Sequence, residues 1–291
     1  MINSFKKYYR KFFAEKLFII KVSGKVVMDK TARDYIVQNI GELINDNIKV
    51  LLIYGGGQTI DKDLKEANVE SLKIDGRRIT REDDIKIIKK TVVGDLGFKL
   101  LESFVKHKLP SNILNALPPH WGHAIRRAPH EDIIRFDGSI ETIDTDAVRE
   151  HFQGTNLMAF PCLGLTNNGT TLNVNADNMA ISIATQTKAD KLILITDIDG
   201  VKKDNKVISV LTAPEAQELI DNDIAVGGMR VKLENCIYAV RNGVKRVHIL
   251  NGFQKDVIKD EVYSSKGVGT MIVREEEKKH YLQEELEGNL S

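Results

Sequence analysis

From residue 17 to residue 273, short and mostly apolar runs alternate with longer segments of helical periodicity. The runs at 17–22, 49–54 and 191–196 are rich in Leu, Ile and Val, which is typical of parallel strands buried on both faces. Residues 30–45, between the first two runs, repeat apolar side chains at helical spacing. This order predicts an α/β fold, a three-layer αβα sandwich around an open, mainly parallel sheet.

The remaining elements follow from the same periodicities: helices at 80–106, 176–186, 212–222 and 229–242, and strands at 157–163, 247–250 and 269–273. Thr80 with Asp83 can cap the first of these helices, and Thr212 with Glu215 forms a capping box for the third. The stretch 109–127 contains three prolines, so we expect it to be irregular or to form a hairpin.

Residues 1–16 form a separate amphipathic segment. Its Lys and Arg residues lie between aromatic side chains that recur at helical spacing: Phe5, Tyr8, Tyr9, Phe12 and Phe13. This pattern predicts a helix, and three surfaces could cover its aromatic side: its own domain, another subunit or a membrane surface. At the other end, residues 274–291 read as a charged tail, either a solvated helix or a frayed end.

Composition narrows the class of partner. The chain of 291 residues carries 42 Lys and Arg against 41 Asp and Glu, so a net charge of +1 gives no field to hold a nucleic acid or an acidic membrane. Its two cysteines, Cys162 and Cys236, have no metal-binding spacing and are expected to be reduced core residues. No apolar run approaches the roughly 20 residues of a spanning helix, and no leader peptide is evident. We therefore expect a cytoplasmic protein that acts on small molecules.

Four clusters contain the residues suited to chemistry: 21–25, 55–59, 173–177 and 227–232. The glycines at 55–57 could form a tight turn, or they could offer bare amides to an anion. Lys21, at the end of a hydrophobic run, could snorkel to solvent or meet a negative group. Asp177 could stabilise a helix N-terminus, and Lys232 could be a solvated helix residue.

The four clusters are far more specific for a protein family when they occur together in this order than when each is taken alone. The chain has no GxxxxGK[ST] loop, no protein-kinase signature and no GxSxG elbow, so a nucleotide enzyme of this sequence must use another phosphate cradle. Over residues 17–273 the four clusters, with the motifs at 76–80, 196–200 and 269–270, resemble the N-acetylglutamate kinase family of the amino-acid kinase superfamily. They are most similar to the branch in which the kinase domain is fused to an acetyltransferase.

The resemblance implies a domain at 17–273 in which an N-lobe, about 17–165, binds an acyl amino acid and a C-lobe, about 166–273, binds ATP. The implied reaction is ATP-dependent phosphorylation of the side-chain carboxylate of N-acetyl-L-glutamate in arginine biosynthesis. It implies Mg²⁺ held by phosphates and water with no direct protein ligand, a homo-oligomer, and arginine as an effector. The implied site residues are these: catalytic Lys21, Asp177 and Lys232; substrate-binding Gly55, Gly56, Arg78 and Asn173; nucleotide-binding Gly24, Thr196, Asp197, Gly200, Val226, Gly228 and Met229.

Departures from the family pattern keep alternatives open. Ser23 stands where the family usually has glycine, Tyr54 where it has histidine, and Gln58 where proline often follows. Residues 114–150 do not match the acceptor side of the family. A related acceptor such as N-acetylaminoadipate or a carrier-linked amino acid therefore stays open, as does an arginine-sensing regulatory domain of an acetylglutamate synthase.

Overall fold

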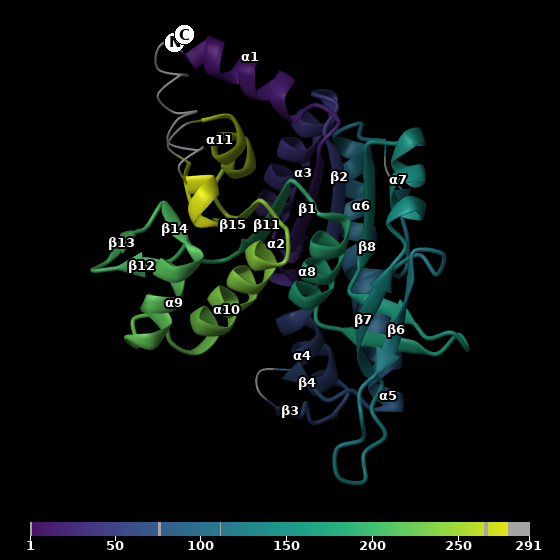
Figure 1. The fold of residues 1–291 in the computed structure, drawn as a ribbon. Helices are drawn as coiled ribbons and strands as arrows, with labels where there is room; N and C mark the ends of the chain where they lie inside the picture. The colour runs from purple at the N-terminus through teal and green to yellow at the C-terminus, as the bar shows by residue number, and fades with distance from the viewer. Residues whose placement is uncertain (1, 75–76, 111, 265–266, 279–291) are drawn as a thin grey trace.

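An eight-stranded sheet forms the centre of the molecule, as the computed structural model shows for residues 2–74, 77–110, 112–264 and 267–278 (Figure 1). Its strand order is β14-β16-β15-β11-β1-β2-β8-β5, and every neighbouring pair is parallel except β15 and β16. The strands are β1 (Leu17–Val22), β2 (Lys49–Tyr54), β5 (Asn112–Ile113), β8 (Leu157–Pro161), β11 (Lys191–Thr196), β14 (Val210–Thr212), β15 (Arg246–Asn251) and β16 (Thr270–Val273). The open, mainly parallel sheet predicted from the apolar runs is confirmed.

A second sheet of four strands lies beside the first, in the order β6-β7-β10-β9. It consists of β6 (Gly122–Arg126), β7 (Asp137–Ile143), β9 (Leu163–Leu165) and β10 (Thr171–Val174). Two small hairpins complete the strands: β3 (Lys73–Ile74) with β4 (Arg77–Arg78), and β12 (Lys202–Lys203) with β13 (Lys206–Val207). The stretch 109–127, expected to be irregular or a hairpin, supplies β5 to the large sheet and the first strand of the β6–β7 hairpin.

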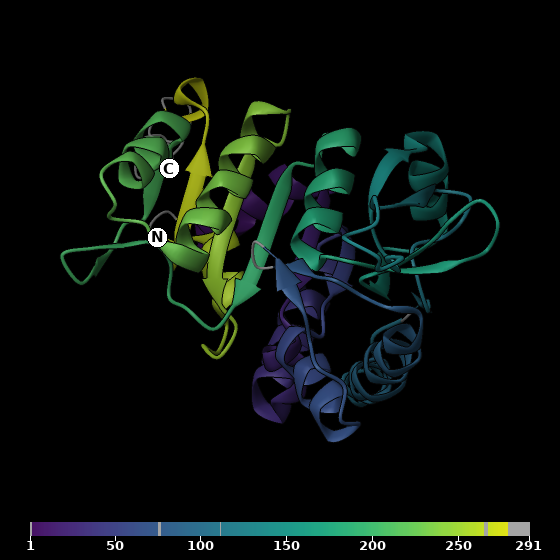
Figure 2. The same cartoon turned by 90° about the horizontal axis from the view of Figure 1, so that it is seen from below.

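Helices cover both faces of the large sheet (Figure 2). One face carries α7 (Thr145–Gly154), α8 (Ala176–Thr187), α9 (Ala213–Asp221) and α10 (Gly227–Arg241). The other face carries α1 (Ile2–Phe13), α2 (Gly24–Met28), α3 (Lys30–Asn45), α4 (Gly57–Glu66), α5 (Glu82–Lys89), α6 (Gly97–Lys106) and α11 (Val257–Tyr263). This is the predicted three-layer sandwich.

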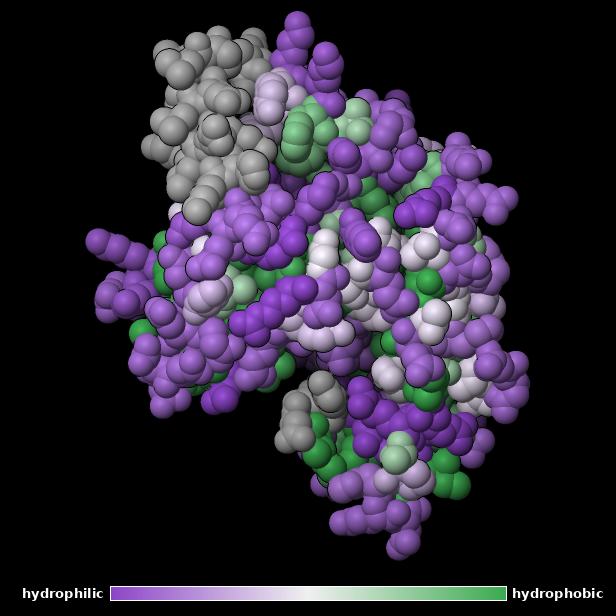
Figure 3. Space-filling view, in the orientation of Figure 1, coloured by the Kyte–Doolittle hydropathy of each residue, from purple (hydrophilic) through white to green (hydrophobic). Residues whose placement is uncertain are grey.

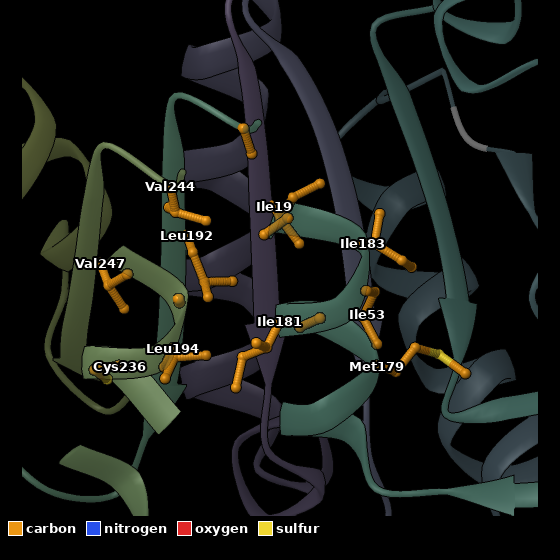
Figure 4. Packing of buried hydrophobic residues seen from close by; sticks show 14 of the residues in the cluster. Ile19, Ile53, Met179, Ile181, Ile183, Leu192, Leu194, Cys236, Val244 and Val247 are labelled. Atoms are coloured by element: carbon orange, nitrogen blue, oxygen red, sulfur yellow. The ribbon is translucent and has the colours of Figure 1, made fainter. Parts of the chain in front are cut away.

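The core has two halves because successive strand residues point to opposite faces. In β1, Ile19 packs toward α8, whereas Phe18 and Ile20 pack toward α3. Figure 4 shows the first half, where Ile19 and Leu194 meet the α8 side chains. Lys21 follows Ile19 by two residues, so it too faces α8.

The helix predicted over 80–106 differs in two respects. It begins with Arg81 as N-cap, whose amide donates to Asp84, because Thr80 is buried and accepts a hydrogen bond from Asn173 instead. It is also not one α-helix, since a π-helical segment, η1 (Lys90–Leu96), separates α5 from α6. The capping box of Thr212 and Glu215 at the start of α9 is confirmed.

The N-terminal helix α1 divides its aromatic residues between two environments. Tyr9 and Phe13 are buried on the chain's own core, where Phe13 meets Phe18 at a ring-centroid distance of 5.3 Å. Tyr8 and Phe12 stack on each other at 5.9 Å and stay exposed. The side chain of Phe5 and the end of the tail, from residue 279, lie outside the described residues. Within the described ranges, no helix has the length and apolar character needed to cross a bilayer.

Candidate active site

The candidate site is a cavity of about 300 Å³ at the carboxyl edge of the large sheet. Its walls include residues that directly follow β1, β2 and β11, as expected where neighbouring parallel strands end together. In the orientation of Figure 3, hydrophilic side chains cover most of the surface, and a notch separates the part that carries α10 from the part that carries α4 and β3. Of the predicted residues, those that line the cavity are Lys21, Gly24, Gly55, Gly56, Arg78, Asn173, Asp177 and Asp197.

Asp177 joins two lysines that are far apart in the sequence. The Nζ atom of Lys21, near the end of β1, lies 2.9 Å from Asp177 Oδ1, and Nζ of Lys232, in α10, lies 4.0 Å from Asp177 Oδ2. Their side chains are only 10% and 16% exposed, so both ammonium groups are largely removed from water. Burial tends to raise the pKa of the Asp177 carboxyl, but Lys21 and then Lys232 outweigh it and hold that pKa below its usual value. The Asp177 carboxyl is therefore ionised at neutral pH and lies between the two lysine side chains.

Glycines allow the loops after β1 and β2 to approach closely. A Cβ atom on Gly24 would lie 2.6 Å from the carbonyl oxygen of Gly55, and one on Gly55 would lie 2.9 Å from Cβ of Ala176. A Cβ on Gly56 would meet the side chains of Ile60 and Val92 at 2.8 Å. No larger residue fits these three positions without displacing its neighbours, which leaves a cavity wall made largely of backbone.

Arg78 and Asn173 occupy the other end of the cavity. Arg78 Nη2 lies 2.7 Å from Asp61 Oδ1 and 3.3 Å from the carbonyl oxygen of Gly57, and Nη1 donates to Ser71. Its side chain is 7% exposed, so the guanidinium group is held in place by three partners. Asn173 donates to Thr80 at 3.0 Å. This end presents a fixed cation and an amide, a combination suited to a carboxylate.

Several residues in or next to the cavity were missed from the sequence, and of these Arg127, Arg135 and Asp137 lie in the stretch 114–150, which matches no family pattern. Arg127 and Asp137 both line the cavity, and Arg135 holds Asp137 with two contacts at 3.0 and 2.5 Å. Cys162 also lines it, and burial raises the pKa of its thiol to about 11, so the group is protonated at neutral pH. The wide spacing of these residues along the chain left no local motif to find.

The residues expected at the nucleotide are only partly brought together. Asp197 lines the cavity and pairs with Lys25 at 2.7 Å, a hydrogen bond that lowers the pKa of its carboxyl. Thr196, Gly200, Val226, Gly228 and Met229 are not among the cavity-lining residues. Gly200, at φ +144°, packs on Thr270, where a Cβ atom would lie 2.5 Å from Oγ1. Val226, Gly228 and Met229 lie at the start of α10, the helix that brings Lys232 to Asp177. Lys232 itself is also not among the cavity-lining residues.

Known proteins resemble this chain over most of its length. The model of the amino acid kinase family matches residues 16–251. An acetylglutamate kinase from Kosmotoga olearia is 31% identical over 277 residues, covering 91% of this chain and 93% of the relative. One from Halothermothrix orenii is also 31% identical, covering 92% of this chain and 94% of the relative.

Solved structures show the same fold. An N-acetylglutamate synthase from Neisseria gonorrhoeae, complexed with coenzyme A and N-acetyl-glutamate, superposes with a TM-score of 0.85 at 23% identity. The superposition covers 94% of this chain, and this chain spans 63% of the length of that synthase. The protein smu.665 from Streptococcus mutans gives a TM-score of 0.72 at 24% identity, covering 88% and 98% of the two chains. On the family match and the two kinase relatives, the chain belongs to the amino acid kinase family, and within it to the acetylglutamate kinases.

Proposed function

We propose that this kinase transfers the γ-phosphoryl group of ATP to the side-chain carboxylate of N-acetyl-L-glutamate, a step of arginine biosynthesis. The observation that carries the proposal is the convergence of Lys21 and Lys232 on Asp177 beside a backbone-lined cavity. The names of the kinase relatives supply the acceptor.

The chemistry needs charge stabilisation more than proton transfer. A glutamyl side-chain carboxylate has a pKa of about 4.3, so it is already a nucleophile at neutral pH. One of its oxygens bonds to the γ-phosphorus as the bond from that phosphorus to the β,γ-bridging oxygen breaks, which gives an acyl phosphate and ADP. Both reactants are anions. The ammonium groups of Lys21 and Lys232 offset the charge on the phosphoryl oxygens, and Asp177 keeps the two cations in position.

We propose the remaining roles on the family resemblance. Arg78 and Asn173, with the amides of Gly55 and Gly56, bind the acyl amino acid, and Arg78 meets its α-carboxylate. Gly24 and Asp197 lie on the nucleotide side, together with Thr196, Gly200 and the start of α10 at Val226, Gly228 and Met229. In the described part of the chain, no three Asp, Glu, His or Cys side chains gather into a metal site. As the family resemblance implies, Mg²⁺ would bind chiefly through phosphate oxygens and water, and would neutralise phosphate charge.

The assay is ADP release with Mg²⁺ and a panel of acceptors: N-acetylglutamate, glutamate, N-acetylaminoadipate and N-acetylaspartate. We expect turnover of N-acetylglutamate that Lys232→Ala abolishes while the fold is retained. Lys86→Ala, which removes a lysine that is 73% exposed on α5, is the matched control and should keep full turnover. Normal turnover by Lys232→Ala would refute the mechanism, and a preference for another acceptor would change only the substrate.

Arginine is the effector we propose, because a related Neisseria gonorrhoeae synthase is complexed with L-arginine in another solved structure. Calorimetric titration tests its binding. Arginine binding in a protein that turns over none of the acceptors would favour the second candidate, a regulatory domain.

We further propose a cytoplasmic homo-oligomer. On α6, Phe98 and Val105 are 64% and 68% exposed and lie on one side of the helix, with Leu101 between them. An exposed apolar helix face fits contact with a second copy.

A further inference from the structure

Ser23 lies at the point where β1 leaves the sheet and enters the site. Its backbone is extended, with φ −70° and ψ 147°, so the alternation of side chains in β1 continues through it. Ile19, Lys21 and Ser23 therefore form one row on the side of the strand that faces α8. Ser23 also lines the cavity, next to Gly24.

Three hydrogen bonds fix the backbone of this residue. Its amide donates to the carbonyl oxygen of Ile195 at 3.1 Å. Its own carbonyl oxygen accepts from the amides of Val26 and Val27, both at 3.1 Å. The side chain is thus the only part of Ser23 that is free to change position.

The Ser23 hydroxyl has no hydrogen-bond partner within the described residues, although it is shielded from solvent. A serine at this position, the N-cap of α2, usually accepts a hydrogen bond from an amide of the first turn, but this side chain makes no such bond. A buried hydroxyl without a partner is unfavourable, so a state in which it finds one is preferred. The residue that matches the family least on this loop is therefore also the one with unused hydrogen-bonding capacity.

We infer that Ser23 is a further catalytic residue, whose hydroxyl turns about its Cα–Cβ bond and donates a hydrogen bond to an oxygen of the phosphoryl group in transfer. The inference rests on the proposed function, since it requires a phosphoryl group between Lys21 and the glycine loops. Ser23 keeps its proton and forms no covalent bond. Its hydroxyl adds a short, neutral donor to the two lysines, which stabilises charge without adding charge.

The test compares Ser23→Ala with wild type in three measurements. The value of kcat should fall about 10- to 100-fold, the usual effect of losing one hydrogen bond to a charged group. Affinity for MgADP with fluoroaluminate and acceptor, which mimics the phosphoryl group in flight, should fall by the same factor while affinity for MgADP alone is unchanged. The melting temperature of the ligand-free protein should not fall, because the substitution removes an unpartnered hydroxyl.

Two further variants complete the design. Ser23→Thr keeps the hydroxyl and should recover most of the lost turnover. Ser139→Ala, on β7 and outside the cavity lining, should match wild type in all three measurements.

An unchanged kcat in Ser23→Ala would overturn the inference. So would a parallel loss of melting temperature, MgADP affinity and turnover, because that pattern means a structural role. Turnover by the wild type distinguishes a failure of the proposed function from a failure of the inference about Ser23. If wild type phosphorylates none of the acceptors, the proposed function fails and takes the inference with it. If wild type is active and Ser23→Ala equals it, only the inference fails.

Discussion

The ammonium group of Lys21 lies 2.9 Å from a carboxylate oxygen of Asp177, and the two residues come from the central strand and from the first turn of the helix that covers it. The pair is fixed by the register of the core, because Lys21 continues the row of β1 side chains that packs on α8. Its position therefore depends on the packing of the whole domain, not on a flexible loop.

Replacing this carboxylate should disable the site. In Asp177→Asn the ammonium groups of Lys21 and Lys232 lose the charge between them, so they repel each other and shift. We expect kcat/KM to fall about 100-fold or more, in the range seen when one charge-stabilising group is removed. Asp146→Asn, on the exposed face of α7, is the control. Equal kcat/KM values for Asp177→Asn and wild type would exclude Asp177 from the mechanism.

The close approach of the two glycine loops can be tested by adding one methyl group. Gly24→Ala would place a Cβ atom 2.6 Å from the carbonyl oxygen of Gly55, so the loops must separate. We expect a loss of about 1–3 kcal/mol in the free energy of unfolding, with weaker nucleotide binding. Gly154→Ala, where a Cβ has no neighbour within 4 Å, should change neither. Urea denaturation and MgADP titration measure the two effects, and equal behaviour of the two variants would contradict the packing argument.

Replacing Arg78 should weaken the binding of the acceptor and leave the binding of the nucleotide unchanged. Arg78→Lys keeps the charge but loses the planar fork that contacts Asp61, Ser71 and Gly57. We expect the KM for N-acetylglutamate to rise about 10- to 100-fold, as for the loss of a charge-assisted hydrogen bond. The KM for ATP should stay within about twofold of wild type. A rise in the KM for ATP with an unchanged KM for N-acetylglutamate would contradict the assignment of Arg78 to the acceptor.

Much of this arrangement could be predicted from the sequence, and the limits have physical causes. The strands β1, β2 and β11 were predictable because strands covered on both faces are apolar along their length. The partnership of Lys21, Asp177 and Lys232 was found from the family resemblance, since no local pattern links residues so far apart. Arg127 and Asp137 were missed because a pair of charges held by tertiary contacts leaves no periodicity in the sequence. The helix at 80–106 was predicted as regular because a π-helical segment keeps the same apolar composition as the helix around it.

A buried histidine should make stability depend on pH. His248 Nδ1 lies 2.7 Å from Glu261 Oε1, and Nε2 lies 3.1 Å from the ammonium group of Lys191. Burial, and next the facing Lys191, lower the pKa of the imidazole to about 4. His248 is therefore protonated only near pH 4 in the folded protein, whereas it is protonated near pH 6.5 in the unfolded chain. Its contribution to the free energy of unfolding is fully present above pH 6.5 and falls as the pH drops toward about 4.

The fall attributable to this group is at most about 3 kcal/mol over that range. His248→Gln, which has no titrating group, should show a shallower loss of melting temperature between pH 6.5 and 4. His123→Gln, at an exposed position, should keep the wild-type slope. Identical slopes for wild type and His248→Gln would show that this imidazole does not titrate differently in the two states.

The exposed face of α6 gives a test of assembly. Phe98→Glu places a charge on the surface proposed to meet a second copy, where burying it would be costly. We expect a lower mass by light scattering with an unchanged melting temperature of the resulting subunit. Lys86→Glu, on α5, is the control for the added acidic residue. A wild-type mass for Phe98→Glu would exclude this face of α6 as the interface. The exposed pair of Tyr8 and Phe12 would then be the next surface to test.

The π-helical segment between α5 and α6 sets how this part of the chain can vary in length. A π-helical turn holds one residue more than an α-helical one, and each residue of an α-helix turns it by about 100°. Losing a single residue such as Gly94, whose Cβ position has no neighbour within 4 Å, would leave an α-helical turn in place of the π-helical one, so α6 would keep its rotation relative to α5. Leu100 and Phe104 would then stay in the core. Natural variants should therefore tolerate the loss of one residue in this segment better than the loss of one residue within α5 or α6.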